Sequence, residues 1–450
     1  MFRNIRLRKP SAHVTVTFET RLMKILTAIA PATSRRWHWL ASCALALAST
    51  LASAQQARVL DANYLDALRQ EVRTNHPTVA AAQARVQAAE AGIRAVRLWE
   101  DPMAGFGVMA AEKEMRRDDG DLMFGAEQVL PRRKLYEARR SRAGAERSIL
   151  EAETKSAVVT LETMVAQAAI ELALVDEMLT IETNQLTWLE SMTANARERL
   201  KDPTANASEP LRIESELAQQ QQKIDSTARQ RLRVMRQLNI LLGRSTDESR
   251  PMLRLPESAA LTPALSEEMS QLFQANPMLQ ALLSTANAAK LDIEVARRER
   301  SPIFSVGVDS SVYSGGDFRQ ATIGAKVTLP FFNNSVYRAN TERARQQQVA
   351  AEREVEALER RLRSEAVVAH TEAENSARQA ATFSKEVLSR AEKAAESTQI
   401  AWVSSKASIL EVLEARRALL NARLEERRFV AAHRAALETL RSIVPPQTKP

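Results

Sequence analysis

The chain has 450 residues, 45% of them hydrophobic, and a formal net charge of +8. Residues 1–54 are predicted to be an export signal, since basic residues up to Arg36 precede an apolar run that ends in Ala52-Ser53-Ala54, the pattern of a signal-peptidase site. This segment holds eight Lys and Arg and one Glu, so the rest of the chain has 55 basic and 54 acidic residues. The positive charge therefore does not support a nucleic-acid-binding protein.

The single cysteine, Cys43, lies within the predicted signal, so an exported chain would be stabilised by packing without disulfides. Two alternatives stay open here. Met23 is a second possible start, and residues 40–43 resemble a lipobox, which would place a lipid on Cys43. Beyond the signal no segment has 18 consecutive apolar residues, and this pattern excludes a transmembrane helix.

Two copies of one plan follow, offset by 200 residues. His76-Pro77 corresponds to Asn276-Pro277, and each pair is followed 25 residues later by another proline, Pro102 or Pro302. Such a repeat at constant spacing indicates internal duplication. The predicted organisation is a first repeat over 55–240, an irregular connector over 241–272, a second repeat over 273–444 and a tail over 445–450.

Each repeat begins with a helix, the first over 77–99, and continues into a strand pair, predicted over 103–130 and 303–329. Ser314-Gly315-Gly316-Asp317 separates two β-branched runs and favours a hairpin. Strands of roughly 9 to 11 residues with weak alternation are typical of outer-membrane barrels. Four strands cannot close a barrel alone, so they either pair with other chains or form a soluble sheet.

Long helical hairpins are predicted over 131–240 and 331–444. Between Pro131 and Leu200 there is one glycine and no proline, which predicts a helix of roughly 100 Å. Residues 201–210 break it, and residues 399–415 are the equivalent turn in the second repeat. Apolar residues at a 3,4 spacing indicate a coiled coil; they are Leu161, Val165, Ala168, Leu172, Val175, Leu179 and Leu186.

Taken together, the duplication, the Leu-Pro after each strand pair, LNILLG at 238–243 and AWVSSKASILEVLEA at 401–415 resemble the TolC family of outer-membrane efflux channels. The resemblance implies a mainly α fold with a small β-barrel part. In this family, a homotrimer closes one 12-stranded outer-membrane barrel with four strands per chain. The internally duplicated coiled-coil hairpins form a periplasmic tunnel.

By position, the resemblance assigns a pore constriction to the hairpin tips. Glu411 and Glu414 correspond to acidic rings at the tunnel mouth, Trp402 to a gating tyrosine, and Glu209 to the acidic position of the first tip. Ser405 replaces the usual tip glycine, which predicts altered turn geometry.

Physical chemistry allows more than one interpretation of these residues. Glu411 and Glu414 share a helix face, and three-fold symmetry would give rings of carboxylates that favour cations; alternatively both are ordinary solvated residues. Trp402 either gates the pore or anchors neighbouring helices.

Small residues at the tips predict a contact surface for the helical hairpin of a periplasmic adaptor, because they allow close approach; a plain turn is the alternative. These residues are Ser404, Ser405, Ala407, Ser408, Ala207 and Ser208.

Motifs of catalysis and cofactor binding are missing from the sequence. His76, His370 and His433 are far apart and have no ligand spacing, and there is no Gly-rich phosphate loop or nucleophile elbow. The prediction is a non-enzyme without a metal or cofactor. Methionines near the strands either pack or form a path for soft metals; they are Met103, Met109, Met115 and Met123.

The function implied is a passive exit duct in the cell outer membrane, with a long periplasmic extension. Its partners would be outer-membrane lipid, a periplasmic adaptor (membrane fusion protein) and an inner-membrane pump of the RND type. Residues 125–146 resemble heavy-metal members of the family, although drugs stay open as substrates. The alternative is a soluble periplasmic coiled-coil adaptor or scaffold.

Overall fold

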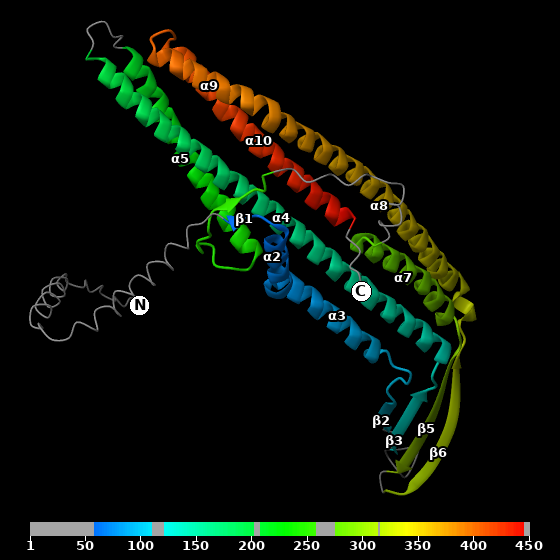
Figure 1. Ribbon diagram of the computed structural model, residues 1–450. Helices are drawn as coiled ribbons and strands as arrows, with labels where there is room; N and C mark the ends of the chain where they lie inside the picture. The colour runs from blue at the N-terminus through cyan, green and yellow to red at the C-terminus, as the bar shows by residue number, and fades with distance from the viewer. Residues whose placement is uncertain (1–57, 110–120, 202–207, 258–274, 314–315, 445–450) are drawn as a thin grey trace, which may run out of the picture. The chain divides into compact units, whose positions relative to one another are not determined.

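Long uninterrupted helices dominate the chain in the computed structural model, which describes residues 58–109, 121–201, 208–257, 275–313 and 316–444 (Figure 1). Three predicted segments lie outside these ranges. They are the signal over 1–54, the loop over 110–120 within the first strand pair, and the tail over 445–450. In the first repeat the elements are α2 (Ala62–Asn75), α3 (Pro77–Ala95), β2 (Met103–Met109), β3 (Asp121–Val129), α4 (Arg133–Arg199) and α5 (Ser208–Leu241).

The second repeat follows the same order. Its elements are α7 (Pro277–Glu299), β5 (Ile303–Tyr313), β6 (Phe318–Thr328), a 3₁₀ turn η2 (Pro330–Asn333), α8 (Asn334–Thr382), a π-helical turn η3 (Phe383–Val387), α9 (Leu388–Val403) and α10 (Ile409–Ile443). The helices α8, η3 and α9 together correspond to α4, and α10 corresponds to α5.

The same local signal starts the equivalent helices α3 and α7. His76 Nδ1 accepts the Thr78 N–H at 3.2 Å, and Asn276 Oδ1 accepts the Met278 N–H at 2.9 Å. A proline follows each cap at the first helical position, where its missing N–H costs nothing. Helix α3 ends at Ala95, four residues before the predicted end, because Val96 is already extended.

One four-stranded antiparallel sheet joins the two repeats, in the order β2-β3-β5-β6. Strand β3 pairs with β5 over nine residues, with Gly125 opposite Asp309. The two predicted strand pairs therefore form a single sheet. A second, two-residue parallel pairing joins β1 (Arg58–Val59) to β4 (Leu253–Arg254) in the connector.

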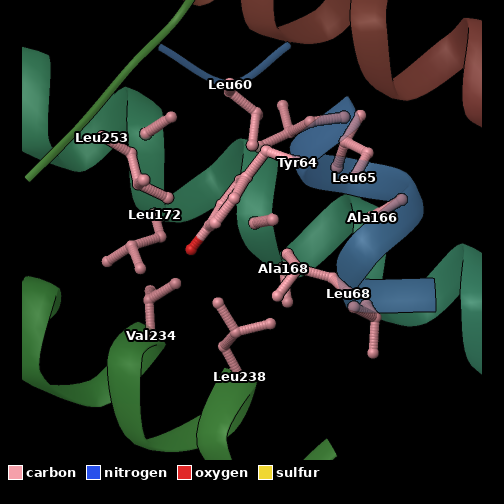
Figure 2. Close-up of a cluster of buried hydrophobic side chains, with 14 of the residues drawn as sticks. Leu60, Tyr64, Leu65, Leu68, Ala166, Ala168, Leu172, Val234, Leu238 and Leu253 are labelled. Carbon is pink, nitrogen blue, oxygen red and sulfur yellow. The ribbon is translucent and has the colours of Figure 1, made fainter. Parts of the chain in front are cut away.

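Figure 2 shows how α2 contributes Leu65 and Leu68 to the main hydrophobic core, which also contains Leu172 of α4 and Leu238 of α5. Helix α2 was not predicted. The sequence does contain the usual marks of a helix here. Asp61 is an N-cap residue, whose side chain accepts the Tyr64 N–H at 2.8 Å, and apolar residues recur at helical spacing after it.

Helix α4 contains one stretch that is long and apolar enough to cross a membrane by length and composition. The sequence analysis excluded a transmembrane helix because no segment has 18 consecutive apolar residues. Helix α4 has no such run either, but its mean hydropathy over a window of that length is high. Val165, Ala169 and Leu172 of α4 are fully buried against other helices of the chain. Within the chain 44% of this stretch is buried, so packing in the core accounts for part of its apolar character.

Buried carboxylates hold the connector against the helices. Asp176 accepts the Leu253 N–H at 2.7 Å and pairs with Arg231, and Glu177 accepts the Leu255 N–H at 2.9 Å. Burial raises the pKa of the Asp176 and Glu177 carboxyls. The hydrogen bonds offset part of this desolvation cost and fix the position of the connector on α4.

Candidate functional site

The turn of the second helical hairpin has the geometry of a Schellman motif. The Lys406 N–H donates to Ala401 O at 2.8 Å and the Ser405 N–H donates to Trp402 O at 2.9 Å, with Ser405 at φ +59°. Ser405 is the single non-glycine residue at positive φ among the described residues. The same motif ends α5, where Gly243 takes the equivalent position at φ +70°. Ser405 thus stands where the backbone favours glycine.

Helix α10 begins immediately after this turn with Ser408 as N-cap. The Ser408 hydroxyl accepts the Glu411 N–H at 3.4 Å and donates to Glu411 Oε1 at 3.2 Å. This reciprocal pairing is a variant of the capping box. Glu411 therefore has a structural role at the helix start, where its negative charge also suits the helix dipole. Both Glu411 and Glu414 are solvent-exposed in the chain.

Trp402 lies inside the tip, with 2% of its surface exposed. It belongs to a cluster that joins both hairpins, including Met192 of α4 and Ile213 of α5. Its indole N–H has no hydrogen-bond partner among the described residues. This placement supports the packing alternative, and a pore-facing gate at Trp402 stays a prediction.

Arg199, at the end of α4, connects the first hairpin to the second turn. Its guanidinium donates to Trp402 O at 3.2 Å and to the Ser405 hydroxyl at 2.9 Å. The same group lies 4.5 Å from the centroid of the Trp402 ring, a cation–π geometry. Three contacts of one side chain therefore hold the turn of the second hairpin against the first.

A second set of contacts lies further along the same helices. Arg416 donates to Gln185 at 3.0 Å and lies 4.9 Å from the ring centroid of Trp188, whose indole N–H donates to Gln399 at 3.2 Å. Burial lowers the pKa of the Arg416 guanidinium. These contacts again connect α4 to both helices of the second hairpin.

An ion pair completes the connection on the α5 side. Arg417 of α10 pairs with Glu216 of α5. Hydrogen bonding to Glu216 raises the pKa of Arg417, and the charge of Glu414 adds to this effect. Glu414 thus belongs to a mixed-charge patch in the single chain.

The structure brings most of the predicted tip residues together in one place. Ser404, Ser405 and Ser408 are exposed, and Ala407 is half-buried under the turn. On the first tip Ser208 is exposed and Glu209 is half-buried in the first turn of α5, while Ala207 lies outside the described residues.

Sequence reasoning missed the cations that hold this site. Arg199, Arg416 and Arg417 lie in runs of charged residues that resemble any solvated helix face. The one available signal is that two tryptophans, Trp188 and Trp402, occur in the helices that lead to the two turns, and each lies beneath an arginine.

The sheet carries two faces of opposite character, defined by residues that pair directly across strands. One face is apolar and exposed: Phe106 is 69% and Ile323 is 83% accessible. We call it the apolar face; its large members are Phe106, Val108, Phe124, Phe304, Val306, Val308, Ile323 and Val327.

The other face, here the polar face, carries an ion pair. Glu127 Oε2 lies 2.6 Å from Lys326 Nζ, and Glu127 Oε1 accepts the Ser305 hydroxyl at 2.6 Å. Asp309, Ser311 and Thr322 follow on the same face by register. A sheet with this pattern suits water on one side and hydrocarbon on the other.

Comparisons with known proteins agree with this architecture. Residues 269–444 match the model of the family described as outer membrane efflux protein. No curated protein matches the chain in sequence.

Among solved structures, the outer-membrane channel OprN is similar with a TM-score of 0.72 at 18% identity, over 84% of this chain and 89% of that one. CusC is similar with a TM-score of 0.73 at 18% identity, over 86% and 93%. The outer membrane protein VceC of Vibrio cholerae gives 0.71 at 17% identity, over 85% and 96%. These matches confirm the resemblance and the fold class predicted from the sequence, with helical hairpins and a small sheet.

Proposed function

We propose that this chain is the outer-membrane channel component of a tripartite efflux system. It acts as a passive exit duct and catalyses no reaction. The observation that carries the proposal is the sheet with an exposed apolar face and an ion-paired polar face, located in a fold that matches outer-membrane channels. Homotrimers would close a 12-stranded barrel from four strands per chain, with outer-membrane lipid against the apolar face.

The alternative of a soluble periplasmic scaffold fits this sheet poorly. Phe106, Phe124 and Ile323 would present a contiguous apolar surface to water, which soluble monomers rarely do. In lipid the same residues are in their favourable environment. The duct therefore explains why the apolar residues share one face.

At the other end of the duct, the two hairpin turns form the proposed constriction and the contact surface for the periplasmic adaptor. Arg199 and Arg417 hold the second hairpin against the first. Release of these contacts would let the second hairpin move away and widen the mouth. The energy for transport comes from an inner-membrane pump, which we propose to be of the RND type.

Substrates pass through such a duct after selection by the pump. The likeness of residues 125–146 to heavy-metal members favours metal cations, with drugs as the competing class. Glu411 and Glu414 would form exposed acidic rings in a trimer and favour cations at the mouth.

The membrane assignment is tested by adjacent residues on opposite faces of β6. Ile323→Lys places a charge on the apolar face, at a cost of about 2–4 kcal/mol near the midplane of a bilayer. Thr322→Lys is the matched control, because Thr322 lies on the polar face. We expect Ile323→Lys to lower the amount of protein recovered in outer membranes, while Thr322→Lys is recovered like the wild type. Equal recovery of both variants and the wild type would show that this face does not contact lipid.

A further inference from the structure

The three described methionines of the first strand pair lie on the polar face of the sheet, while Met115 lies outside the described residues. Met103 pairs with Glu127 and Met123 pairs with Gly107, so both share the face that carries the Glu127–Lys326 ion pair. Met109 is two and six residues from Gly107 and Met103 on the same strand and therefore has the same orientation. The apolar face carries Phe, Val and Ile at its exposed large positions.

This placement is not what hydrophobicity alone predicts. A methionine used as a hydrophobic filler belongs on the apolar face with Phe106 and Val108. Met103 is 57% exposed and Met109 46% exposed. They are therefore thioethers presented to the polar side of the sheet, and we call Met103, Met109 and Met123 the thioether row.

The backbone around the thioether row leaves room for a bound ion. Met109 pairs with Asp121, which places it diagonally to Met123, at about 7–8 Å between Cα atoms. Met123 Sδ would lie 3.9 Å from a Cβ at Gly107, so its side chain extends over that glycine. Methionine has three flexible torsions, so the two sulfur atoms can approach one ion above Gly107.

Carboxylates lie beside the thioether row. Met103 is directly opposite Glu127. A Cβ at Gly125 would meet Asp309 Oδ1 at 2.5 Å, so the Asp309 carboxylate lies over Gly125, two residues from Met123. Glu127 is paired with Lys326 and Arg319 lies over the ring of Tyr313, so the Asp309 carboxylate is the acidic group beside Met123 that could attract a cation.

Thioether sulfur is a soft ligand that selects soft monovalent cations such as Cu(I) over hard ones. We infer that the thioether row binds soft monovalent cations, Cu(I) or Ag(I), as a transient site inside the duct. Met103 lies six residues along the strand from Met109, so Met109 and Met123 are the pair that can share one ion. Two thioethers without a thiolate give a weak site, and conduction requires a site that releases its ion readily. This inference rests on the proposed duct and specifies its substrate class as a soft metal cation.

The test measures Ag⁺ binding to the full chain in detergent by titration calorimetry. Every protein carries Cys43→Ser, so that any chain that retains the predicted signal cannot bind Ag⁺ through this thiol. The test variant combines Met103→Leu, Met109→Leu and Met123→Leu, which keep volume and apolar character but remove sulfur. The matched control combines Met164→Leu and Met278→Leu, two exposed methionines on helices α4 and α7.

We expect the triple variant to bind Ag⁺ at least about ten-fold more weakly, since loss of even outer partners of a metal costs 10–100-fold, and the control to bind like the wild type. Equal affinity of the triple variant and the wild type, or an equal loss in the control, would overturn the inference. Conductance of the same samples in planar bilayers separates the two proposals. If the wild type conducts but the triple variant binds Ag⁺ with the same affinity, the soft-metal site alone is refuted. If the wild type does not conduct, the duct is refuted.

Discussion

Arg199 is the residue whose removal tests the tip most directly. Arg199→Ala deletes the hydrogen bonds to Trp402 O and Ser405 Oγ and the cation–π contact with the Trp402 ring. A net hydrogen bond contributes about 0.5–1.5 kcal/mol and an exposed cation–π contact about 0.5–1 kcal/mol. Because Arg199 is partly exposed, we discount the sum to about 1–3 kcal/mol.

At 1.4 kcal/mol per factor of ten, this loss shifts the equilibrium between a closed and a widened tip by roughly 5- to 150-fold. The expected result is a higher open probability in single-channel recordings from planar bilayers. Arg197→Ala is the matched control, because Arg197 is also at the end of α4 but pairs with Glu214 inside the same hairpin at 2.6 Å. It should leave the open probability unchanged. If Arg199→Ala gates like the wild type, or if both variants open equally, the contacts of Arg199 do not hold the tip closed.

Three further predictions concern the tip and the buried carboxylates. The double variant Glu411→Ala/Glu414→Ala should weaken divalent-cation block of the pore, because rings of carboxylates attract cations; unchanged block would remove the acidic-ring assignment. Ser405→Gly should be more stable than Ser405→Ala by about 1 kcal/mol in thermal unfolding, because both lose the hydroxyl and only glycine adopts φ +59° without strain; equal melting temperatures would contradict this. Burial raises the pKa of Glu426 above its unfolded value, so its favourable contribution is complete below an unfolded pKa of about 4.3 and is lost as the pH rises through the folded value. As the pH is lowered from neutral to the unfolded pKa of about 4.3, the melting temperature of the wild type should therefore rise relative to Glu426→Gln, and a difference independent of pH would refute this.

The repeat was accessible from the sequence because its markers are local. His76-Pro77 and Asn276-Pro277 start helices by a cap and a proline, whatever packs against them. The position of the second turn was also predictable, since a helix without glycine or proline from residue 334 to 443 has to reverse somewhere. The π-helical turn at Phe383–Val387 had no such marker.

The contacts of the tip depend on which helices meet, and a sequence does not state this. Trp402 could face a pore or a core by pattern alone, and its burial follows from the approach of α4 and α5. Arg199 lies 203 residues from its acceptor Trp402 O. The unfavourable φ of Ser405 follows from the geometry of the turn, which the neighbouring caps impose.

The sheet, too, was predictable from the sequence only in part. Glycine and β-branched residues predicted strands near 103–130 and 303–329. The alternation of polar and apolar residues along them was weak, because the polar face includes five glycines and three methionines, which are not polar side chains. Only the pairing of all four strands places Ile323 and Phe106 on one face and Met123 and Glu127 on the other. Two faces became visible once the four strands were paired.

The central claim is that the chain forms a trimeric duct through the outer membrane. The most direct measurement is planar-bilayer conductance of the detergent-extracted protein, with its mass determined in the same preparation. The account predicts a particle of three chains that conducts in small steady steps and is blocked by divalent cations from the tip side. A water-soluble monomer or dimer without conductance would contradict it.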